Sequence, residues 1–311
     1  MRDDQIEHEF VVENECHGWR LDRFLQKRIP RLSRERVQRV IRGECWVDGR
    51  PARPGQTVRP GQAVVFRRPA PEEPEVPREI PIVRTDDSFY VIDKPAGLPM
   101  HPTAKWHKST LTAVLRERFP DEDLQIAHRI DLETSGLLLV ARTPAATVAC
   151  KRAFARRLVK KRYLAIVHGA PPEAGTIDAP LALGGGLVRV KMHVRADGLP
   201  SVTRFRRLEQ RGAYALVECE PITGRQHQIR AHLDHLGCPI VGDKLYPDET
   251  VFADFQDHGW ERIADRVALP RQALHAAWLR FPHPVSGEEV EVSVELPDDL
   301  RAFWDGCVGA T

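Results

Sequence analysis

The spacing of hydrophobic and polar positions changes along the chain. After residue 80, short apolar runs bounded by turn residues recur, and two longer stretches repeat apolar residues at helical spacing. The short runs predict strands at residues 89–92, 137–140, 163–167, 187–190 and 214–217, and the longer stretches predict helices at 145–158 and 226–236. Because strands and helices do not alternate regularly, this order favours an α+β domain over repeated βαβ units.

The first part of the chain has a pattern that predicts two short helices followed by strands. The apolar stripe of the first helix is Leu21, Phe24 and Leu25, and that of the second is Val37, Val40 and Ile41. Ser33 can cap the second helix by accepting from its free backbone N–H groups. Residues 46–66 then predict short strands joined by turns. The polar faces of the two helices carry the cations Arg23, Lys27, Arg34 and Arg42.

A proline-rich acidic segment separates these two patterns. Residues 69–77 contain four prolines and three glutamates, a composition that forms neither a helix nor a central strand. The chain is therefore predicted to contain an N-terminal extension, a small α/β domain, a linker and a larger domain. Their bounds are residues 1–17, 18–68, 69–80 and 81–311.

The formal net charge of +2 hides an uneven distribution. Residues 20–68 contain 14 Arg and Lys against four Asp and Glu, a net charge of +10, so the rest of the chain carries −8. A cationic module of this kind is typical of nucleic-acid binding, because each phosphate that it neutralises releases condensed counterions. The alternative is a cationic face that is only solvated.

Composition excludes several other classes of protein. The chain has 311 residues, 42% of them hydrophobic, which is enough for two cores, but it has no apolar run of about eighteen residues to span a membrane. The charged N-terminus argues against a secretory signal, so a cytoplasmic protein is expected. The six cysteines form no Cys-x-x-Cys pair, and this spacing predicts neither a zinc site nor a disulfide framework.

One polar loop stands out because it leads directly into an apolar run. Residues 128–136 read His-Arg-Ile-Asp-Leu-Glu-Thr-Ser-Gly and continue into Leu-Leu-Leu-Val-Ala. The loop offers one carboxylate, Asp131, next to the cation Arg129, at the mouth of a buried strand, where enzymes often place reactive groups. An ordinary polar turn before a core strand explains the same pattern.

Residues 128–136 resemble, position by position, the signature segment of pseudouridine synthases of the large-subunit ribosomal RNA type, the RluA, RluC and RluD family. Three further segments are similar to motifs of this family and occur in the same order. They are residues 93–102 (Asp-Lys-Pro-Ala-Gly-Leu-Pro-Met-His-Pro), 161–165 (Lys-Arg-Tyr-Leu-Ala) and 223–232 (Thr-Gly-Arg-Gln-His-Gln-Ile-Arg-Ala-His). Four ordered segments are more specific than any one of them.

The resemblance implies a pseudouridine synthase fold, with a mixed, largely antiparallel central sheet and the active site in a cleft across it. Residues 18–68 resemble a small RNA-binding domain found in a ribosomal small-subunit protein, the αL motif. Two positions depart from the pattern of that domain. Asp48 stands where Asn usually precedes the turn glycine, and Gln62 stands where Asp usually follows Gly61. Both lie on turns, so the fold is expected to survive.

The reaction of this family converts uridine into pseudouridine by moving the sugar from a ring nitrogen to carbon 5 of the same base. No atom is added or removed, so no cofactor is expected, but a carboxylate must act as nucleophile or base. By resemblance this residue is Asp131. The sequence leaves open whether it attacks the sugar, attacks the ring or removes a sugar proton.

The resemblance also implies roles for other residues. Arg230, rather than Arg225, is expected to keep Asp131 ionised, although a surface pair with Asp234 is the simpler alternative. Tyr163 is expected to stack on the uracil, with a core aromatic as the alternative, and Arg129 to enter the stack that a flipped base leaves. The further expected substrate or RNA contacts are His128, Lys94, His101, Arg225 and Ile229, with Arg23, Lys27, Arg34 and Arg42 in the small domain.

The histidines predict no metal site. His227, His232 and His235 share one predicted helix, but their spacing differs from the i,i+4 pair of a helical zinc motif. His101 and His128 are expected to be hydrogen-bonding scaffolds of the cleft. No metal partner is therefore expected.

Three classes of function are compatible with the chain: an RNA pseudouridine synthase, an RNA-binding protein without activity, and a hydrolase that pairs Asp131 with Glu133. The ordered motifs favour the first class. The expected substrate is ribosomal RNA, with transfer RNA as the alternative, and nothing in the sequence demands more than a monomer.

Overall fold

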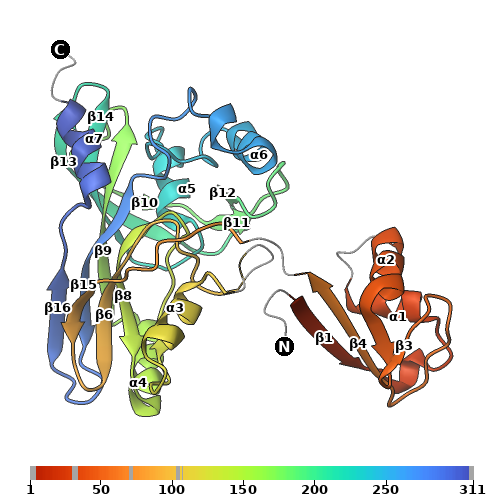
Figure 1. Ribbon diagram of the computed structural model, residues 1–311. Helices are drawn as coiled ribbons and strands as arrows, with labels where there is room; N and C mark the ends of the chain where they lie inside the picture. The colour runs from red at the N-terminus through yellow and green to blue at the C-terminus, as the bar shows by residue number, and fades with distance from the viewer. Residues whose placement is uncertain (1–4, 30–33, 70–72, 103–105, 107, 308–311) are drawn as a thin grey trace. The chain divides into compact units, whose positions relative to one another are not determined.

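The computed structural model describes residues 5–29, 34–69, 73–102, 106 and 108–307 (Figure 1). It divides the chain into two compact units, a small unit of Met1–Glu72 and a large unit of Glu73–Thr311. Each unit has its own hydrophobic core.

The large unit is built on a mixed sheet. Its strands, with the small hairpin β11–β12, are β5 (Ile82–Thr85), β6 (Phe89–Lys94), β7 (Gln125–Ile126), β8 (Ser135–Ala141), β9 (Lys160–His168), β10 (Ala174–Asp178), β11 (Leu181–Leu183), β12 (Met192–Val194), β13 (Val202–Arg211), β14 (Tyr214–Pro221), β15 (Leu274–Pro282) and β16 (Glu289–Ser293). The order is β10-β13-β14-β9-β15-β8-β6-β5, with β16 on β15 and β7 on β8. Among the described strands only β8 and β15 pair in parallel, so the predicted α+β class with a largely antiparallel sheet is confirmed.

The central strands β6 and β8 are buried on both faces, and this explains their continuous apolar sequence. Leu138 and Val140 of β8 face the larger core, whereas Leu137 and Leu139 face a second core on the other side of the sheet. Because successive residues of a strand point to opposite faces, both sets must be apolar. The strand therefore has no solvent-facing side, and only its polar N-terminal end is available for chemistry.

Helices cover both faces of this sheet. They are α3 (Leu111–Arg118), α4 (Pro144–Ala155), α5 (Gln228–His235), α6 (Glu249–His258), the 3-10 turn η2 (Trp260–Arg262) and α7 (Asp298–Gly306). Helices α3, α5 and α7 contribute to the larger core, and α4 contributes to the second one. Among the described residues no helix is both long and apolar enough to cross a membrane.

One strand prediction is wrong. Residues 187–190 form bends and turns rather than a strand, and Leu187 and Val190 are exposed. They lie in the connection between β11 and β12, after three successive glycines, so no neighbouring strand is available to pair with them. Residues 246–260 contain α6, whose N-cap Asp248 accepts from the backbone N–H of Thr250.

The small unit has a four-stranded sheet in the order β1-β4-β2-β3. Its elements are β1 (Gln5–Val11), η1 (Asn14–Cys16), α1 (Leu21–Arg28), α2 (Arg34–Glu44), β2 (Cys45–Val47), β3 (Arg50–Pro51) and β4 (Ala63–Pro69). The predicted stripes of the two helices pack into one core with β2 and β4. The predicted cap Ser33 lies outside the described residues.

The predicted N-terminal extension is wrong as a separate part, because β1 pairs with β4 along its whole length. This strand brings acidic residues back to the cationic module. Residues 1–72 contain 15 Arg and Lys and 11 Asp and Glu, so the net charge of the small unit is +4 rather than +10. Ion pairs join Glu15 to Lys27, Glu13 to Arg28 and Glu7 to Arg67.

The two positions that depart from the αL pattern are partners of each other. Gln62 Nε2 donates to Asp48 Oδ2 at 2.8 Å, and the other oxygen of Asp48 accepts from the backbone N–H of Ala63 at 2.9 Å. Asp48 and Gly49 both have positive φ, as a tight hairpin turn between β2 and β3 requires. The two residues that differ from the αL pattern therefore bind each other, and Asp48 also binds the backbone beside Gln62.

Candidate active site

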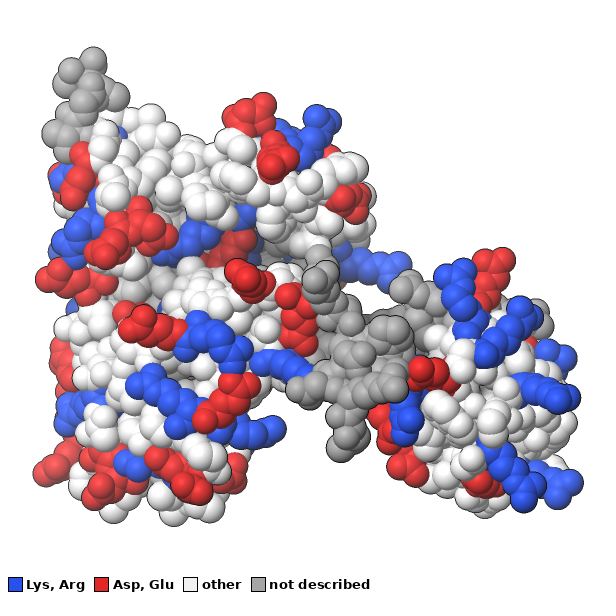
Figure 2. Space-filling view, in the orientation of Figure 1, with Lys and Arg blue, Asp and Glu red and all other residues white. Residues whose placement is uncertain are grey.

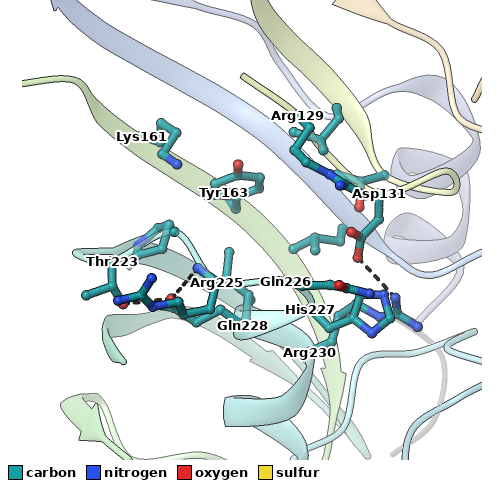
Figure 3. Close-up of a pocket in the computed structure, with 16 residues that line it drawn as sticks. Arg129, Asp131, Lys161, Tyr163, Thr223, Arg225, Gln226, His227, Gln228 and Arg230 are labelled. Atoms are coloured by element: carbon teal, nitrogen blue, oxygen red, sulfur yellow. Dashed lines mark hydrogen bonds and ion pairs between the residues drawn. The ribbon is translucent and has the colours of Figure 1, made fainter. Parts of the chain in front are cut away.

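An open pocket of about 250 Å³ lies where the signature loop, β9 and the start of α5 meet (Figure 3). Residues from all three segments point into it. The lining consists of residues 129–131, 134, 161, 163, 221, 223–230 and 274.

The signature loop, residues 128–134, is held by hydrogen bonds to the end of β6. The Leu132 carbonyl accepts from the backbone N–H of Gly97 at 2.9 Å and from Lys94 Nζ at 3.1 Å. The backbone N–H of Thr134 donates to the Asp131 carbonyl at 3.2 Å. These bonds fix the backbone at Asp131 and directly after it.

The expected contact between Lys94 and substrate or RNA is wrong. Its side chain is fully buried under the loop, where the ammonium also donates to the carbonyls of Pro95 and Leu98 at 2.7 and 3.1 Å. Burial lowers the pKa of Lys94 to about 7. With all three donors used and no place in the pocket lining, Lys94 supports the loop from below.

Arg230 joins two carboxylates across the pocket wall. Its Nη1 donates to Asp131 Oδ2 at 3.0 Å, while Nε and Nη2 donate to the two oxygens of Asp243 at 2.6 and 2.9 Å. Asp243 also accepts from the backbone N–H groups of Leu245 and Tyr246. The ion pair predicted between Arg230 and Asp131 is therefore present, and the alternative pair with Asp234 is not the one formed.

The surroundings of Asp131 favour its ionised form. Burial by itself would raise the pKa of this carboxyl, but the charge of Arg230, with His227 and Arg129, outweighs burial and lowers the pKa. Burial by itself would lower the pKa of the Arg230 guanidinium, but the charges of Asp243 and Asp131 outweigh burial and raise this pKa. A carboxylate that stays charged beside an open pocket is suited to act as nucleophile or base.

Strand β9 contributes two side chains to the pocket, Lys161 and Tyr163, which are two residues apart and thus on one face. Figure 3 shows both of them along one side of the pocket, with Asp131 beyond the tyrosine. Burial and the charge of Asp131 raise the pKa of Tyr163, so its hydroxyl is protonated at neutral pH. Tyr163 is largely buried in the core, as the second alternative predicts, but it also lines the pocket, and its stacking on uracil stays a prediction.

Gln228, at the first position of α5, organises the segment that faces these side chains. Its Oε1 accepts from the Thr223 hydroxyl at 2.7 Å and from the backbone N–H of Arg225 at 3.0 Å, and its Nε2 donates to Val202 and Thr203. The helix begins two residues later than predicted, because His227 has a left-handed backbone with a φ of 52°. This bend directs His227 and Arg230 to the end of the pocket that contains Asp131 (Figure 3).

Of the remaining predicted contacts, some line the pocket and others do not. Arg129, Arg225 and Ile229 line the pocket. His128 lies in an adjoining groove, packs at a tilt against the ring of Phe154 and accepts from the backbone N–H of Leu139 at 3.2 Å. Burial lowers its pKa to about 3, so the ring is neutral. His101 is exposed and does not line the pocket, so its expected role as a cleft scaffold is not supported.

The sequence analysis missed three residues of the site: His227, Asp243 and Lys161. His227 was considered only as a metal ligand, and Lys161 only as part of a motif. Asp243 lies 13 residues after Arg230 with two glycines between them, so no helical or strand spacing connects the two. A search for an acidic partner of a buried arginine could have suggested it, but not its position.

The predicted cations of the small unit lie on its two helices. Arg23 and Lys27 of α1 are exposed and lie over the ring of Trp19, at 4.3 and 5.4 Å from its centroid. Arg42 of α2 is exposed, and the side chain of Arg34 lies outside the described part. On the face of the small unit seen in Figure 2, blue side chains outnumber red ones.

Glu133 is not a second carboxylate for a hydrolase. It is bound by Lys244 Nζ at 2.5 Å and by the backbone N–H of Gln272 at 3.2 Å, and it lies in a turn rather than a strand. Within the described ranges, one group has the geometry of metal ligands, Glu13, Glu15 and Cys16. Both glutamates already pair with cations of α1, so this group offers no support for a metal centre.

The large unit thus combines a mixed sheet with a pocket that contains an arginine-bound aspartate and a buried tyrosine, as the resemblance to pseudouridine synthases predicts. Comparison with known proteins agrees. Residues 88–235 match the model of the RNA pseudouridylate synthase family. The ribosomal large subunit pseudouridine synthase D of Xanthomonas campestris is 39% identical over 94% of this chain and 89% of its own length. An uncharacterised RNA pseudouridine synthase of Chloroflexus aurantiacus is 41% identical over 91% and 88%.

The solved structure of human RNA pseudouridylate synthase domain containing 1 matches with a TM-score of 0.58 and 28% identity, over 77% of this chain and 98% of that one. The chain belongs to the RNA pseudouridylate synthase family, and it is an RNA pseudouridine synthase, an isomerase whose substrate is RNA.

Proposed function

We propose that this protein isomerises specific uridines of large-subunit ribosomal RNA, with Asp131 as its catalytic carboxylate. The observation that carries the proposal is the position of Asp131, which is held by Arg230 at 3.0 Å and faces an open pocket lined by Tyr163. Support for the substrate comes from the relatives of Xanthomonas campestris and Zymomonas mobilis, both named ribosomal large subunit pseudouridine synthase D.

The geometry suits a division of labour between two groups. Asp131 is the charged group, and it acts on the sugar or on the ring while Arg230 prevents its protonation. Tyr163 keeps its proton because burial raises its pKa, so it can stack on the uracil and donate from its hydroxyl. No cofactor is needed, since the isomerisation has no net oxidation or transfer to a second molecule.

Base flipping is the proposed route of the target into the pocket. A uridine stacked in structured RNA cannot reach Asp131, and extruding it costs a few kcal/mol. Arg129 is exposed, lies two residues before Asp131 and lines the pocket, so its guanidinium can enter the place that the base leaves. Arg129→Ala is expected to slow the modification of structured RNA more than it weakens binding; an equal loss in both would contradict this role.

The small unit is proposed to add sequence-independent affinity for RNA. Its net charge is +4, and its exposed Arg23 and Lys27 lie beside Trp19. Exposed cations of this kind can contact phosphates of the RNA backbone whatever the base sequence.

Mapping of pseudouridines by carbodiimide labelling and reverse transcription tests the proposal. Total RNA is compared from cells with the gene intact, deleted, or carrying Asp131→Asn, with Asp123→Asn as the control, because that carboxylate is exposed. One or a few sites in large-subunit ribosomal RNA should disappear in the deletion and in Asp131→Asn only. Loss of sites in transfer RNA instead would contradict the proposed substrate, and full activity of purified Asp131→Asn would contradict the proposed catalytic residue.

A further inference from the structure

A second depression continues from the active-site pocket, and its wall is cationic. The basic groove is defined here by the four cations that line it, Arg129, Arg157, Lys161 and Arg225. Three of them, Arg129, Lys161 and Arg225, also line the pocket around Asp131. No Asp or Glu is among the described residues that line the groove. A groove with one sign of charge attracts an anion, and the protein supplies none in its wall.

Lys161 is the central cation of this groove, and it has no counter-ion. Its side chain forms no hydrogen bond or ion pair within the described part of the chain, and its Nζ lies over the ring of Phe154, 6.0 Å from the ring centroid. Burial lowers the pKa of Lys161, and its charge further lowers the pKa of neighbouring His128. Partial burial of an ammonium without a counter-ion costs free energy, and an anion that binds to it recovers part of this cost.

Lys94, a fully buried lysine of the large unit, shows what a structural role looks like. Lys94 donates to three backbone carbonyls and has no donor left. Lys161 lies beside two openings and keeps its donors free of hydrogen bonds to the described residues. This contrast indicates that Lys161 is kept for a ligand rather than for the fold.

Two neighbouring elements orient the other cations toward the same place. Arg157 follows α4 in a left-handed conformation, with a φ of 58°, at the position where a helix usually ends on glycine. The backbone N–H of Leu158 donates to the Ala153 carbonyl at 2.9 Å, which closes the helix and places Arg157 at the groove. Across the pocket, Thr223 and Arg225 face Lys161 (Figure 3).

We propose that the basic groove binds the RNA backbone next to the target uridine, with Lys161 holding the adjoining phosphate and with Arg157 and Arg225 holding its neighbours. The inference rests on the proposed function. A uridine whose sugar lies at Asp131 must direct its phosphates out of the pocket. The wall that the pocket shares with the groove carries Arg129, Lys161 and Arg225, so phosphates that leave along this wall would meet cations. Lys161 thereby acts as a positioning residue for the sugar as well as a binding residue.

The salt dependence of binding tests the contact without any need for a known substrate. Binding of the full-length protein to a single-stranded uridine decamer is measured over a range of salt concentrations. Each phosphate contact on a single strand contributes about 0.7 to the slope of log affinity against log salt concentration. Lys161→Gln and Arg157→Gln should each reduce this slope by about 0.7. The matched control is Lys160→Gln, because Lys160 is exposed on the same strand and does not line the groove; its slope should be unchanged.

A chemical change in the RNA identifies the phosphate. In an RNA that the wild-type protein modifies, the phosphate on the 5′ or the 3′ side of the target is replaced by a neutral methylphosphonate. One of these should lower kcat/KM of the wild type by at least about tenfold, but it should have little further effect on Lys161→Gln. Lys161→Arg should restore part of the loss, and thermal unfolding of each variant separates a loss of contact from a loss of fold.

Additive losses from the methylphosphonate and Lys161→Gln at both positions would overturn the inference, as would equal salt slopes for Lys161→Gln and Lys160→Gln. These results differ from a failure of the proposed function. In that case Asp131→Asn would still modify RNA, or the modified RNA would be of another class, whatever the effect of Lys161.

Discussion

At the scale of single residues, two carboxylates share the guanidinium of Arg230, and their surroundings decide which of them can react. Asp243 has no exposed side-chain surface and accepts four hydrogen bonds, two from Arg230 and two from the backbone. The side chain of Asp131 is 23% exposed and accepts one bond from the same guanidinium. Asp243 is therefore saturated and orients Arg230, whereas Asp131 keeps an oxygen for the pocket.

Asp243→Asn should destabilise the protein strongly. The amide cannot balance the buried charge of Arg230, and breaking one side of a buried ion pair costs about 3–5 kcal/mol. Urea denaturation should show this loss in the free energy of unfolding. Asp234→Asn is the control, because Asp234 lies on α5 near the same site and burial raises the pKa of its carboxyl, so the amide should be tolerated. Similar losses in the two variants would show that the Asp243–Arg230 pair is not special.

The ionisation of Asp131 predicts a pH dependence of stability. Its pKa in the folded protein lies below the ordinary value of about 3.9, so the charged form stabilises the fold above that pH, and this contribution is lost as the pH falls through the folded pKa. The difference in unfolding free energy between wild type and Asp131→Asn should be constant above about pH 5 and should shrink below about pH 4. Urea denaturation at several pH values measures it; a difference that grows on acidification would contradict the lowered pKa.

At the scale of elements, the signature loop and the central sheet meet at one glycine. Gly136, the second residue of β8, has a φ of +114°, and a Cβ there would lie 2.4 Å from the carbonyl oxygen of Ala276 in β15. This is the place where β8 and β15 pair in parallel. The close approach places Ser135 against His275, whose Nδ1 lies 2.9 Å from the Ser135 hydroxyl, and it ends the signature loop at a fixed point of the sheet.

Gly136→Ala should therefore damage the fold and the site together. A left-handed backbone strains alanine by about 1–3 kcal/mol, and the overlap with β15 adds to this because backbone must move. Gly287→Ala is the control, since Gly287 also has positive φ, +77°, but has no atom within 4 Å of the added Cβ. Thermal unfolding should show a clearly larger drop in Tm for Gly136→Ala, with loss of pseudouridine formation in that variant alone.

At the scale of the whole molecule, two units with separate cores are joined through a proline-rich segment. The boundary falls between Glu72 and Glu73, and the second half of the predicted linker already belongs to the large unit, because Ile80 is buried in its core and Val76 packs against it. All residues of the pocket come from the large unit. The proposed catalytic site and the proposed additional RNA affinity therefore belong to different units.

Removal of residues 1–72 should leave the large unit folded and able to form pseudouridine, with a raised KM for RNA. The truncated protein loses a net charge of +4, and two to four lost phosphate contacts would reduce the salt slope of RNA binding by about 1.5–3.5. Full-length Arg23→Gln with Arg42→Gln serves as the comparison and should show part of the same reduction. An unchanged KM and slope would mean that the small unit does not contact RNA.

The sequence determined what depends on short-range pattern. The apolar run of β8 predicted a buried strand, and the apolar stripes of α1 and α2 predicted two helices. The polar residues directly before β8 predicted that Asp131 lies at the mouth of that strand. These predictions succeeded because each residue's burial follows from the period of its own element. The resemblance to a known family added the pairing of Asp131 with Arg230, which lie 99 residues apart.

Only the tertiary structure decided the rest, because it depends on which elements meet. Asp243 reaches Arg230 through a turn with no periodic relation to α5, and Lys94 turned inward because three carbonyls converge on it. Pairing of β1 with β4 adds acidic residues to the small unit and lowers its net charge. Lys161 of β9 and the segment after β14 line one groove, and no Asp or Glu is among the described residues of that lining. Charge and hydrogen-bonding capacity are written in the sequence, but which groups satisfy one another is set by long-range packing.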